Sequence, residues 1–190
     1  MLGANGGRSK SNSSSFLVLD SRDTSWYRII HAKGQDQWFP PHKNSYVVST
    51  PTTSYVSMGI TFFDTARAYS DSEHKLGLAF QGMWDKVYVA SKTAAVTPED
   101  FWKDLQTSLT TLGRDYLDLY QFHNPSFCPR PGDGSGLYEC MLEAKEQGKI
   151  RHIGITNHRL AVADEAINSG LYETLQFPFS YLSAQQELDL

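Results

Sequence analysis

The chain has 190 residues, of which 40% are hydrophobic and 20% charged, and its formal net charge is −4. This length supports one domain with a hydrophobic core, and the negative charge excludes a general electrostatic attraction for nucleic acid. No apolar run approaches the ~18 residues of a membrane span, and the two cysteines, Cys128 and Cys140, provide neither a disulfide framework nor a four-ligand metal site. Because no apolar signal segment begins the chain, the sequence predicts a cytoplasmic protein without metal, nucleic-acid or membrane partners.

The first 57 residues differ in character from the rest of the chain. The opening stretch, MLGANGGRSKSNSSS, is rich in Gly, Ser and Asn and predicts disorder. Residues 15–20, SFLVLD, are compatible with a short strand, but the aromatic residues that follow have no clean helical or strand period. We therefore expect residues 1–57 to form an unassigned, largely disordered or irregular segment, followed by an ordered domain at 58–190.

From residue 58 onward, short apolar runs alternate with amphipathic stretches. Runs rich in β-branched and aromatic residues predict strands at 60–64, 86–92, 116–123, 150–157 and 174–179. Amphipathic stretches predict helices at 69–80, 98–112, 137–147 and 160–169. This alternation is typical of a parallel sheet covered by helices, so the sequence predicts an α/β fold.

Two of the predicted helices carry recognisable start signals. Thr97 supplies an N-cap hydroxyl ahead of Pro98 and two acidic residues, and Gly113 is suited to end the same helix. In the first predicted helix, Ser70 and Glu73 have the spacing of a capping box, in which the glutamate bonds back to the start of the helix.

Polar residues stand at the carboxyl end of each predicted strand. They are Asp64, Lys92, His123, Asn157 and Gln176. Parallel strands bring these ends to one edge of the sheet, which is the edge where ligands bind in such folds. No glycine-rich phosphate loop follows the first strand, which argues against a dinucleotide fingerprint of that type.

Asp64, Lys92, His123 and the nearby Tyr69 suggest one kind of chemistry. A lysine beside a tyrosine stabilises the phenolate, and an aspartate paired with the lysine keeps the lysine charged. The tyrosine can then donate a proton to a carbonyl oxygen while a hydride reaches the carbon, and the histidine can hydrogen-bond that same oxygen.

The residues around these positions resemble those of the aldo-keto reductase family. The motifs that carry the resemblance are FDTARAYSDSE at 63–73, VASK at 89–92, DLYQFH at 118–123, IGITN at 153–157 and LQFPFS at 175–180. They occur in the order of the family and cover the chain from about Met58 to Ser183. The resemblance implies a partial (β/α)8 TIM barrel, roughly strands 2 to 5 or 6 with their helices, and NAD(P)H-dependent reduction of a small-molecule aldehyde or ketone, with NADPH favoured.

The resemblance also implies roles for individual residues. Asp64, Tyr69, Lys92 and His123 match the catalytic tetrad of the family, and Tyr69 matches its general acid. Thr156, Asn157 and Gln176 match positions that contact the nicotinamide. From the residues alone, Asn157 could equally cap the helix that starts near residue 160. Ser70 stands where the family usually has glycine.

The resemblance does not extend to every part of the family's pattern. A complete barrel needs roughly 250 residues, and the motifs of the sixth to eighth βα units, which hold the cofactor phosphates in the family, are not found. One alternative function is therefore a catalytically inactive fragment or pseudoenzyme. A further alternative is a half-barrel that self-associates through the exposed edges of its sheet.

Overall fold

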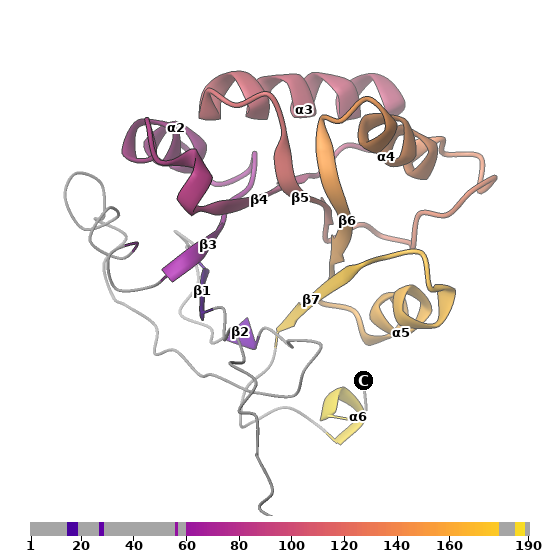
Figure 1. Ribbon diagram of the computed structural model, residues 1–190. Coiled ribbons are helices and arrows are strands. Elements are labelled where there is room, and N and C mark those ends of the chain that lie inside the picture. Colours follow the sequence, from indigo (N-terminus) through magenta and orange to yellow (C-terminus); the bar gives the residue numbers. More distant parts are fainter. Residues whose placement is uncertain (1–14, 19–26, 29–55, 57–59, 179–184, 189–190) are drawn as a thin grey trace, which may run out of the picture.

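The computed structural model describes residues 15–18, 27–28, 56, 60–178 and 185–188. A curled sheet of five parallel strands forms half of a barrel, with the helices on its outer side (Figure 1). The five strands are β3 (Ile60–Asp64), β4 (Tyr88–Thr93), β5 (Leu117–His123), β6 (Ile150–Thr156) and β7 (Thr174–Pro178). Each pairs in parallel with the next along the chain. The predicted α/β fold class and partial barrel are thus confirmed.

Two short strands from the first 57 residues occupy the outer positions of this sheet. β1 (Ser15–Val18) pairs in parallel with β3, and β2 (Tyr27–Arg28) pairs antiparallel with β7. The strand interpretation of residues 15–20 is confirmed over Ser15–Val18. The rest of the expected irregular segment lies outside the described residues, apart from residue 56.

Four helices cover the outer face of the sheet (Figure 1). They are α2 (Ser72–Ala79), α3 (Pro98–Leu112), α4 (Leu137–Glu146) and α5 (Leu160–Ser169). Two shorter elements are the 3-10 turn η1 (Trp84–Lys86) and α6 (Gln185–Leu188). Each main helix connects two neighbouring parallel strands, as the short alternating elements of the sequence predict.

Helix α3 begins and ends where its sequence predicts. The hydroxyl of Thr97 accepts a hydrogen bond from the backbone N–H of Asp100 at 3.2 Å, and Gly113 ends the helix with φ of 69°. The apolar face of α3 is buried against the sheet through Phe101, Leu105, Leu109 and Leu112. Burial of such a face contributes most of the stability of a surface helix.

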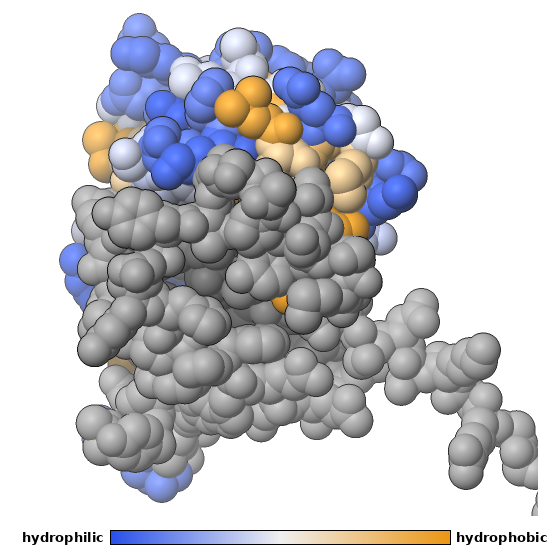
Figure 2. All heavy atoms as spheres, turned by 90° about the vertical axis from the view of Figure 1, so that its left-hand side faces the viewer, coloured by the Kyte–Doolittle hydropathy of each residue, from blue (hydrophilic) through white to orange (hydrophobic). Residues whose placement is uncertain are grey.

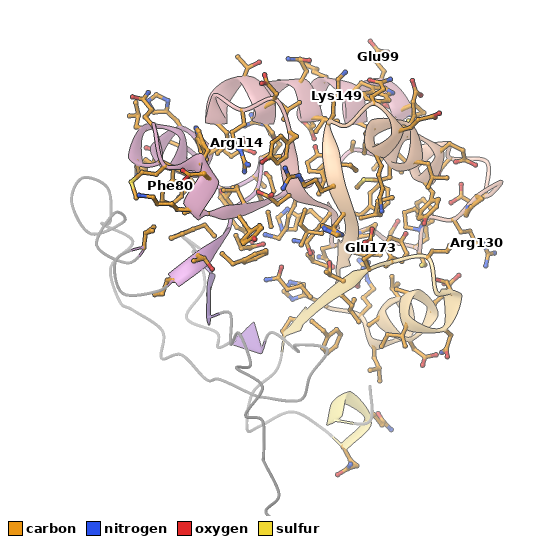
Figure 3. All side chains as sticks on the ribbon, viewed as in Figure 1. Phe80, Glu99, Arg114, Arg130, Lys149 and Glu173 are labelled. Atoms are coloured by element: carbon orange, nitrogen blue, oxygen red, sulfur yellow. The ribbon has the colours of Figure 1, made fainter. Side chains whose placement is uncertain are left out.

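The hydrophobic core lies between the helices and the outer face of the strands. Phe80, which is labelled in Figure 3, follows α2. Its ring lies against that of Phe63 on β3, with ring centroids 4.5 Å apart. Gly77 allows α2 to approach α3 closely, because a Cβ atom at this position would lie 2.7 Å from the carbonyl oxygen of Thr111. The core therefore fixes α2 to the sheet just after the loop that leaves β3.

A second buried cluster lies at the amino edge of the sheet. Asp118 on β5 accepts hydrogen bonds from Arg114 at 2.7 Å, from Arg151 at 3.3 Å and from the backbone N–H of Val89 at 2.9 Å. The guanidinium of Arg114 lies over the ring of Tyr116, with its Cζ 4.4 Å from the ring centroid. Arg151 lies over the same ring, with its Cζ at 3.9 Å.

The described surface shows only scattered apolar groups. Large exposed hydrophobic side chains occur on different elements: Leu78, Tyr88, Val96, Phe127, Leu142 and Ile167. Figure 2 views the molecule from the side of α2, where small apolar patches lie among hydrophilic side chains. Among the helices of the described residues, none combines the length and the apolar character of a membrane span. In the same residues, His, Cys, Asp and Glu side chains form no group of three or more that could hold a metal ion.

Candidate active site

The carboxyl edge of the sheet brings the predicted site residues together through strand register. Lys92 lies opposite Gln121 on the neighbouring strand, and His123 lies opposite Thr156. Thr156 in turn lies opposite Gln176 on β7. Side chains of one strand alternate between the two faces, so residues two apart, such as Gln121 and His123, share the inner face.

Asp64 and Lys92 form a buried ion pair at the centre of this edge. The side chains are 3% and 1% exposed, and the Lys92 ammonium donates a hydrogen bond to the Asp64 carboxylate. Lys92 also donates to the backbone carbonyl of Thr65 at 2.9 Å. A buried cation needs such partners, because an unpaired charge inside a protein costs several kcal/mol. The ion pair fixes the position of the ammonium beside the loop that follows β3.

Tyr69 and His123 flank this ion pair. The Lys92 Nζ lies 4.9 Å from the centroid of the Tyr69 ring. The Tyr69 and His123 rings are 5.5 Å apart between centroids and meet edge to face at 84°. The structure thus gathers all four residues of the predicted tetrad in one place, with Tyr69 8% exposed and His123 partly exposed.

The backbone after Tyr69 adopts a turn that suits glycine better than serine. Ser70 has φ of 49°, which lies in the left-handed region. The amide of Tyr69 donates to the carbonyl of Ala66 at 3.0 Å, and the amide of Ser72 donates to the carbonyl of Tyr69 at 2.9 Å. The resemblance implies glycine at this position, and the structure shows that Ser70 occupies a strained backbone position.

Two of the residues predicted to contact a nicotinamide, Thr156 and Asn157, already bond to the loops beside His123. The hydroxyl of Thr156 accepts from the amide of Asn124 at 3.3 Å. Asn157 is fully buried, and its side-chain amide donates to the carbonyl of Pro125 at 2.8 Å while its oxygen accepts from the amide of Arg159, also at 2.8 Å. Asn157 therefore supports the start of α5 from two residues before its N-cap, Arg159.

Gln121 is a buried member of the site that the sequence analysis did not select. Its side-chain amide donates to the second oxygen of Asp64 at 3.3 Å, and the residue is 2% exposed. The signal for it was its position two residues before His123 in the same strand, which places both on one face.

The capping-box prediction for Ser70 and Glu73 is wrong. The helix begins at Ser72, and Glu73 makes no bond back to its start. Its carboxylate instead accepts a hydrogen bond from Ser91 on β4 at 2.6 Å and pairs with Arg67. The glutamate is 2% exposed, and tertiary partners outweigh the local cap.

Another tyrosine near the site is unsuited to exchange protons. Tyr120 points to the opposite face of the sheet from Gln121 and is fully buried under the helices. Burial, together with the negative charge of Asp104, raises its pKa far above the ordinary value of 10. Tyr69 is therefore the phenol at this edge that lies beside a lysine and a histidine.

The arrangement can bind an oxygen and deliver a proton to it. Tyr69 has an acidic hydrogen, Lys92 supplies a fixed positive charge beside it, and His123 supplies a further hydrogen-bonding nitrogen. Thr156, Asn157 and Gln176 form a row of hydroxyl and amide groups along the adjacent strand ends. Asn157 is fully buried, and its amide already donates to Pro125 and accepts from Arg159.

The fold and this cluster define a parallel α/β barrel-type protein with an ion-paired lysine, a phenol and an imidazole at the carboxyl edge. The family model for the Aldo/keto reductase family matches residues 36–188. The chain belongs to the aldo/keto reductase family. The match begins upstream of Met58, the start that the motifs indicated, so the family relation extends into the first 57 residues.

Individual relatives give the same family relation. The aldo-keto reductase YhdN of Bacillus subtilis is 31% identical over 146 residues, which are 70% of this chain and 43% of that protein. The methylglyoxal reductase DkgB of Salmonella typhi is 34% identical over 136 residues, which are 66% of this chain and 48% of that protein. The chain thus spans a little under half the length of these curated relatives.

A solved structure of an aldo-keto reductase from Klebsiella pneumoniae in complex with NADPH has a similar fold. The TM-score is 0.55 and the identity 26%, and the likeness covers 65% of this chain and 44% of that one.

Proposed function

We propose that this chain carries the proton-donating half of an NADPH-dependent carbonyl reductase that acts on small aldehydes or ketones. The observation that supports this most strongly is the convergence at one strand edge of the Asp64–Lys92 ion pair, the Tyr69 ring and the His123 ring. Membership of the aldo/keto reductase family supports the same chemistry.

In the proposed reaction, Tyr69 donates its hydroxyl proton to the carbonyl oxygen of the substrate. The phenolate that remains is stabilised by the Lys92 ammonium, whose charge is maintained by Asp64. His123 hydrogen-bonds the carbonyl oxygen and so orients the substrate. Proton transfer from a positioned side chain contributes typically about 10²–10⁴-fold in rate.

The cofactor contact is proposed for the strand ends beside His123. When bound, NADPH supplies the hydride that reaches the carbonyl carbon. Thr156, Asn157 and Gln176 would hydrogen-bond the carboxamide of the nicotinamide and fix the plane of its ring. The Klebsiella pneumoniae relative with bound NADPH supports this choice of cofactor over NADH.

The test is steady-state consumption of NADPH by the purified chain with methylglyoxal as substrate. Methylglyoxal is a three-carbon aldehyde, small enough to need few contacts in a substrate pocket. We expect turnover in the wild-type chain and a loss of at least about 100-fold in Tyr69→Phe, which keeps the ring but removes the proton. The matched control is Tyr88→Phe, because Tyr88 lies exposed at the start of β4, away from the site. Equal loss in both variants, or none in Tyr69→Phe, contradicts the proposal.

The competing proposal is a chain that has the fold of the family without its activity. The observation that favours it is the short span of the match, because the chain covers less than half of each of the two relatives. Absence of turnover together with absence of NADPH binding by fluorescence titration would support this alternative and reject the reductase proposal for this chain.

Three further proposals concern the whole molecule. We propose that residues 58–190 form the main barrel unit, to which β1 and β2 add short outer strands. We also propose that the protein acts in the cytoplasm, and that the sheet edges beyond β1 and β2 allow self-association. Sedimentation at micromolar concentration tests the last of these, because a monomer contradicts it.

A further inference from the structure

Glu73 is a buried carboxylate that the proposed proton transfer does not use. It lies in the first turn of α2 and is 2% exposed. Both of its partners belong to other parts of the chain: Ser91 on β4 donates to it at 2.6 Å, and Arg67 in the loop after β3 forms an ion pair with it. Transfer of a carboxylate from water into the protein interior costs free energy, even when the carboxylate is paired. An apolar side chain of similar size often stabilises a protein equally well. The buried ion pair is therefore weak evidence for a role in stability alone.

Both partners of Glu73 stand next to residues of the site. Ser91 immediately precedes Lys92 in β4, and because strand side chains alternate, Ser91 points to the helices while Lys92 points to Asp64. Arg67 precedes Tyr69 by two residues. Glu73 thus links the strand that carries the lysine with the loop that carries the phenol.

The loop from Thr65 to Ser72 depends on such links for its shape. The amide of Arg67 donates to the carbonyl of Lys92 at 3.1 Å, and the hydroxyl of Thr65 donates to Ser72 at 2.8 Å. Ser70, in the left-handed region, adds strain that the surrounding contacts have to balance. Loss of the Glu73 contacts would remove the side-chain links from this turn to Ser91 and Arg67, and would leave the Arg67 amide, the Thr65 hydroxyl and the turn's own backbone bonds to hold it.

We propose that Glu73 is a positioning residue, which holds the Tyr69 loop against β4 and so sets the phenol beside the Lys92 ammonium. The proposal rests on the proposed function for its effect on turnover. The structural part, in which Glu73 restrains the loop, can be measured without turnover.

The first measurement is amide hydrogen exchange on the cofactor-free chain. In Glu73→Gln we expect the amides of Arg67, Tyr69 and Ser72 to exchange at least about tenfold faster, because the local opening of the loop becomes easier. Amides of the β5–β6 pairing should change by less than about twofold. The matched control is Glu165→Gln, which removes an Arg–Glu pair of the same kind from the surface, where Glu165 pairs with Arg130 at 3.2 Å.

The second measurement is the division of the effect between kcat and KM. With the loop loosened, we expect kcat to fall about 10- to 100-fold with the KM for NADPH unchanged, because a displacement of the proton donor by about 1 Å has effects of this size. Ser91→Ala should show the same pattern with a smaller loss of kcat. This variant keeps the ion pair between Glu73 and Arg67, so it tests the inference even if Glu73→Gln does not fold. Arg67→Lys should retain more activity than Arg67→Met.

The outcomes separate this inference from the proposed function. A wild-type chain without turnover rejects the proposed function, while exchange still decides whether Glu73 restrains the loop. If Tyr69→Phe loses turnover but Glu73→Gln and Ser91→Ala keep it, the inference about Glu73 is overturned and the proposed function stands. A uniform increase of exchange across β5 and β6 as well as the loop also overturns it, because Glu73 would then be only a contributor to global stability.

Discussion

The two edges of the parallel sheet each hold a buried aspartate paired with cations, but they use different cations. At the amino edge, Asp118 is shared by Arg114 and Arg151, whose guanidinium groups lie over the ring of Tyr116. At the carboxyl edge, Asp64 is held by Lys92 and Gln121. Arginine stays protonated in proteins and bonds in a fixed planar geometry, whereas lysine is a point charge on a flexible chain.

This difference indicates what each edge can do. The aromatic group at the amino edge is covered by two guanidinium groups, which favours a fixed structure. At the carboxyl edge the lysine lies beside Tyr69 and His123, both of which can exchange protons. The amino edge is therefore suited to stability and the carboxyl edge to chemistry. In barrel folds generally, active sites lie at the carboxyl ends of the strands, and the amino ends serve stability.

The largest effect is expected for Lys92→Met, which removes the cation at the carboxyl edge. Turnover should fall by at least about 10³-fold, because the phenolate of Tyr69 loses its stabilising charge. The free energy of unfolding should fall by about 3–5 kcal/mol, because the Asp64 carboxylate stays buried without its lysine. Activity assays and urea unfolding measure the two effects. The double variant Lys92→Met/Asp64→Asn should recover part of the stability but none of the turnover. If Lys92→Met alone is as stable as the wild type, the ion pair does not stabilise the fold as expected.

A change at the amino edge should affect stability alone. In Asp118→Asn, the buried guanidinium of Arg114 loses its charged partner, so the free energy of unfolding should fall by about 3 kcal/mol. The kcat of the folded fraction should remain within about twofold of the wild-type value, because no group at the carboxyl edge is altered. Urea unfolding and kcat corrected for the folded fraction test this, and a large drop in kcat would remove the distinction between the edges.

A smaller change in stability is expected for Gly154→Ala in the middle of β6. An added Cβ would lie 2.2 Å from the Thr174 hydroxyl oxygen and 3.0 Å from the Cγ of Gln121. Overpacking of this kind costs about 1–3 kcal/mol. Since Gln121 supports Asp64, kcat should fall as well. The double variant Gly154→Ala/Thr174→Ala removes the hydroxyl oxygen nearest to the added Cβ and should recover stability. If Gly154→Ala alone is as stable as the wild type, the strands move apart easily and the prediction is wrong.

The smallest effect is expected for Glu173→Gln, which lies near the amino end of β7. Burial opposes ionisation of Glu173, but hydrogen bonds from Lys145, His152 and the amide of Ile153 outweigh it and lower its pKa from 4.5 to about 2. Because the folded pKa is the lower one, the ionised group stabilises the fold above about pH 4.5, and this contribution is lost as the pH falls towards 2.

The measurement compares urea unfolding of the wild type and Glu173→Gln over that pH range. The side chain is 39% exposed, so solvent screening limits the difference to less than about 1 kcal/mol at neutral pH. The difference should shrink as the solution is acidified. A difference that grows towards low pH has the opposite sign and contradicts the assignment.

The sequence predicted the elements that carry strong local signals. The hydroxyl of Thr97, the apolar face of α3 and the glycine at 113 fixed the bounds of that helix, and the structure has it at Pro98–Leu112. The proximity of Asp64, Lys92 and His123 was also predictable, since parallel strands place their carboxyl ends side by side.

The contacts that depend on tertiary partners were not predictable. Glu73 has the spacing of a local cap, but its true partners are Ser91, 18 residues away, and Arg67. Gln121 donates to a residue 57 positions earlier in the chain. Local sequence patterns predict which face of a helix or strand a residue occupies, but not which atoms its side chain contacts there.

The chain separation of the site residues has a consequence for folding kinetics. Asp64 is 28 residues from Lys92 and 57 from Gln121, so three successive strands and the two helices between them have to dock before the three side chains meet. Contacts that close long loops form later than helices, because the entropy of loop closure has to be overcome first. During refolding, the helical circular dichroism signal should therefore recover before the carboxyl-edge cluster assembles, and a chain arrested at that stage would have normal helix content without the cluster.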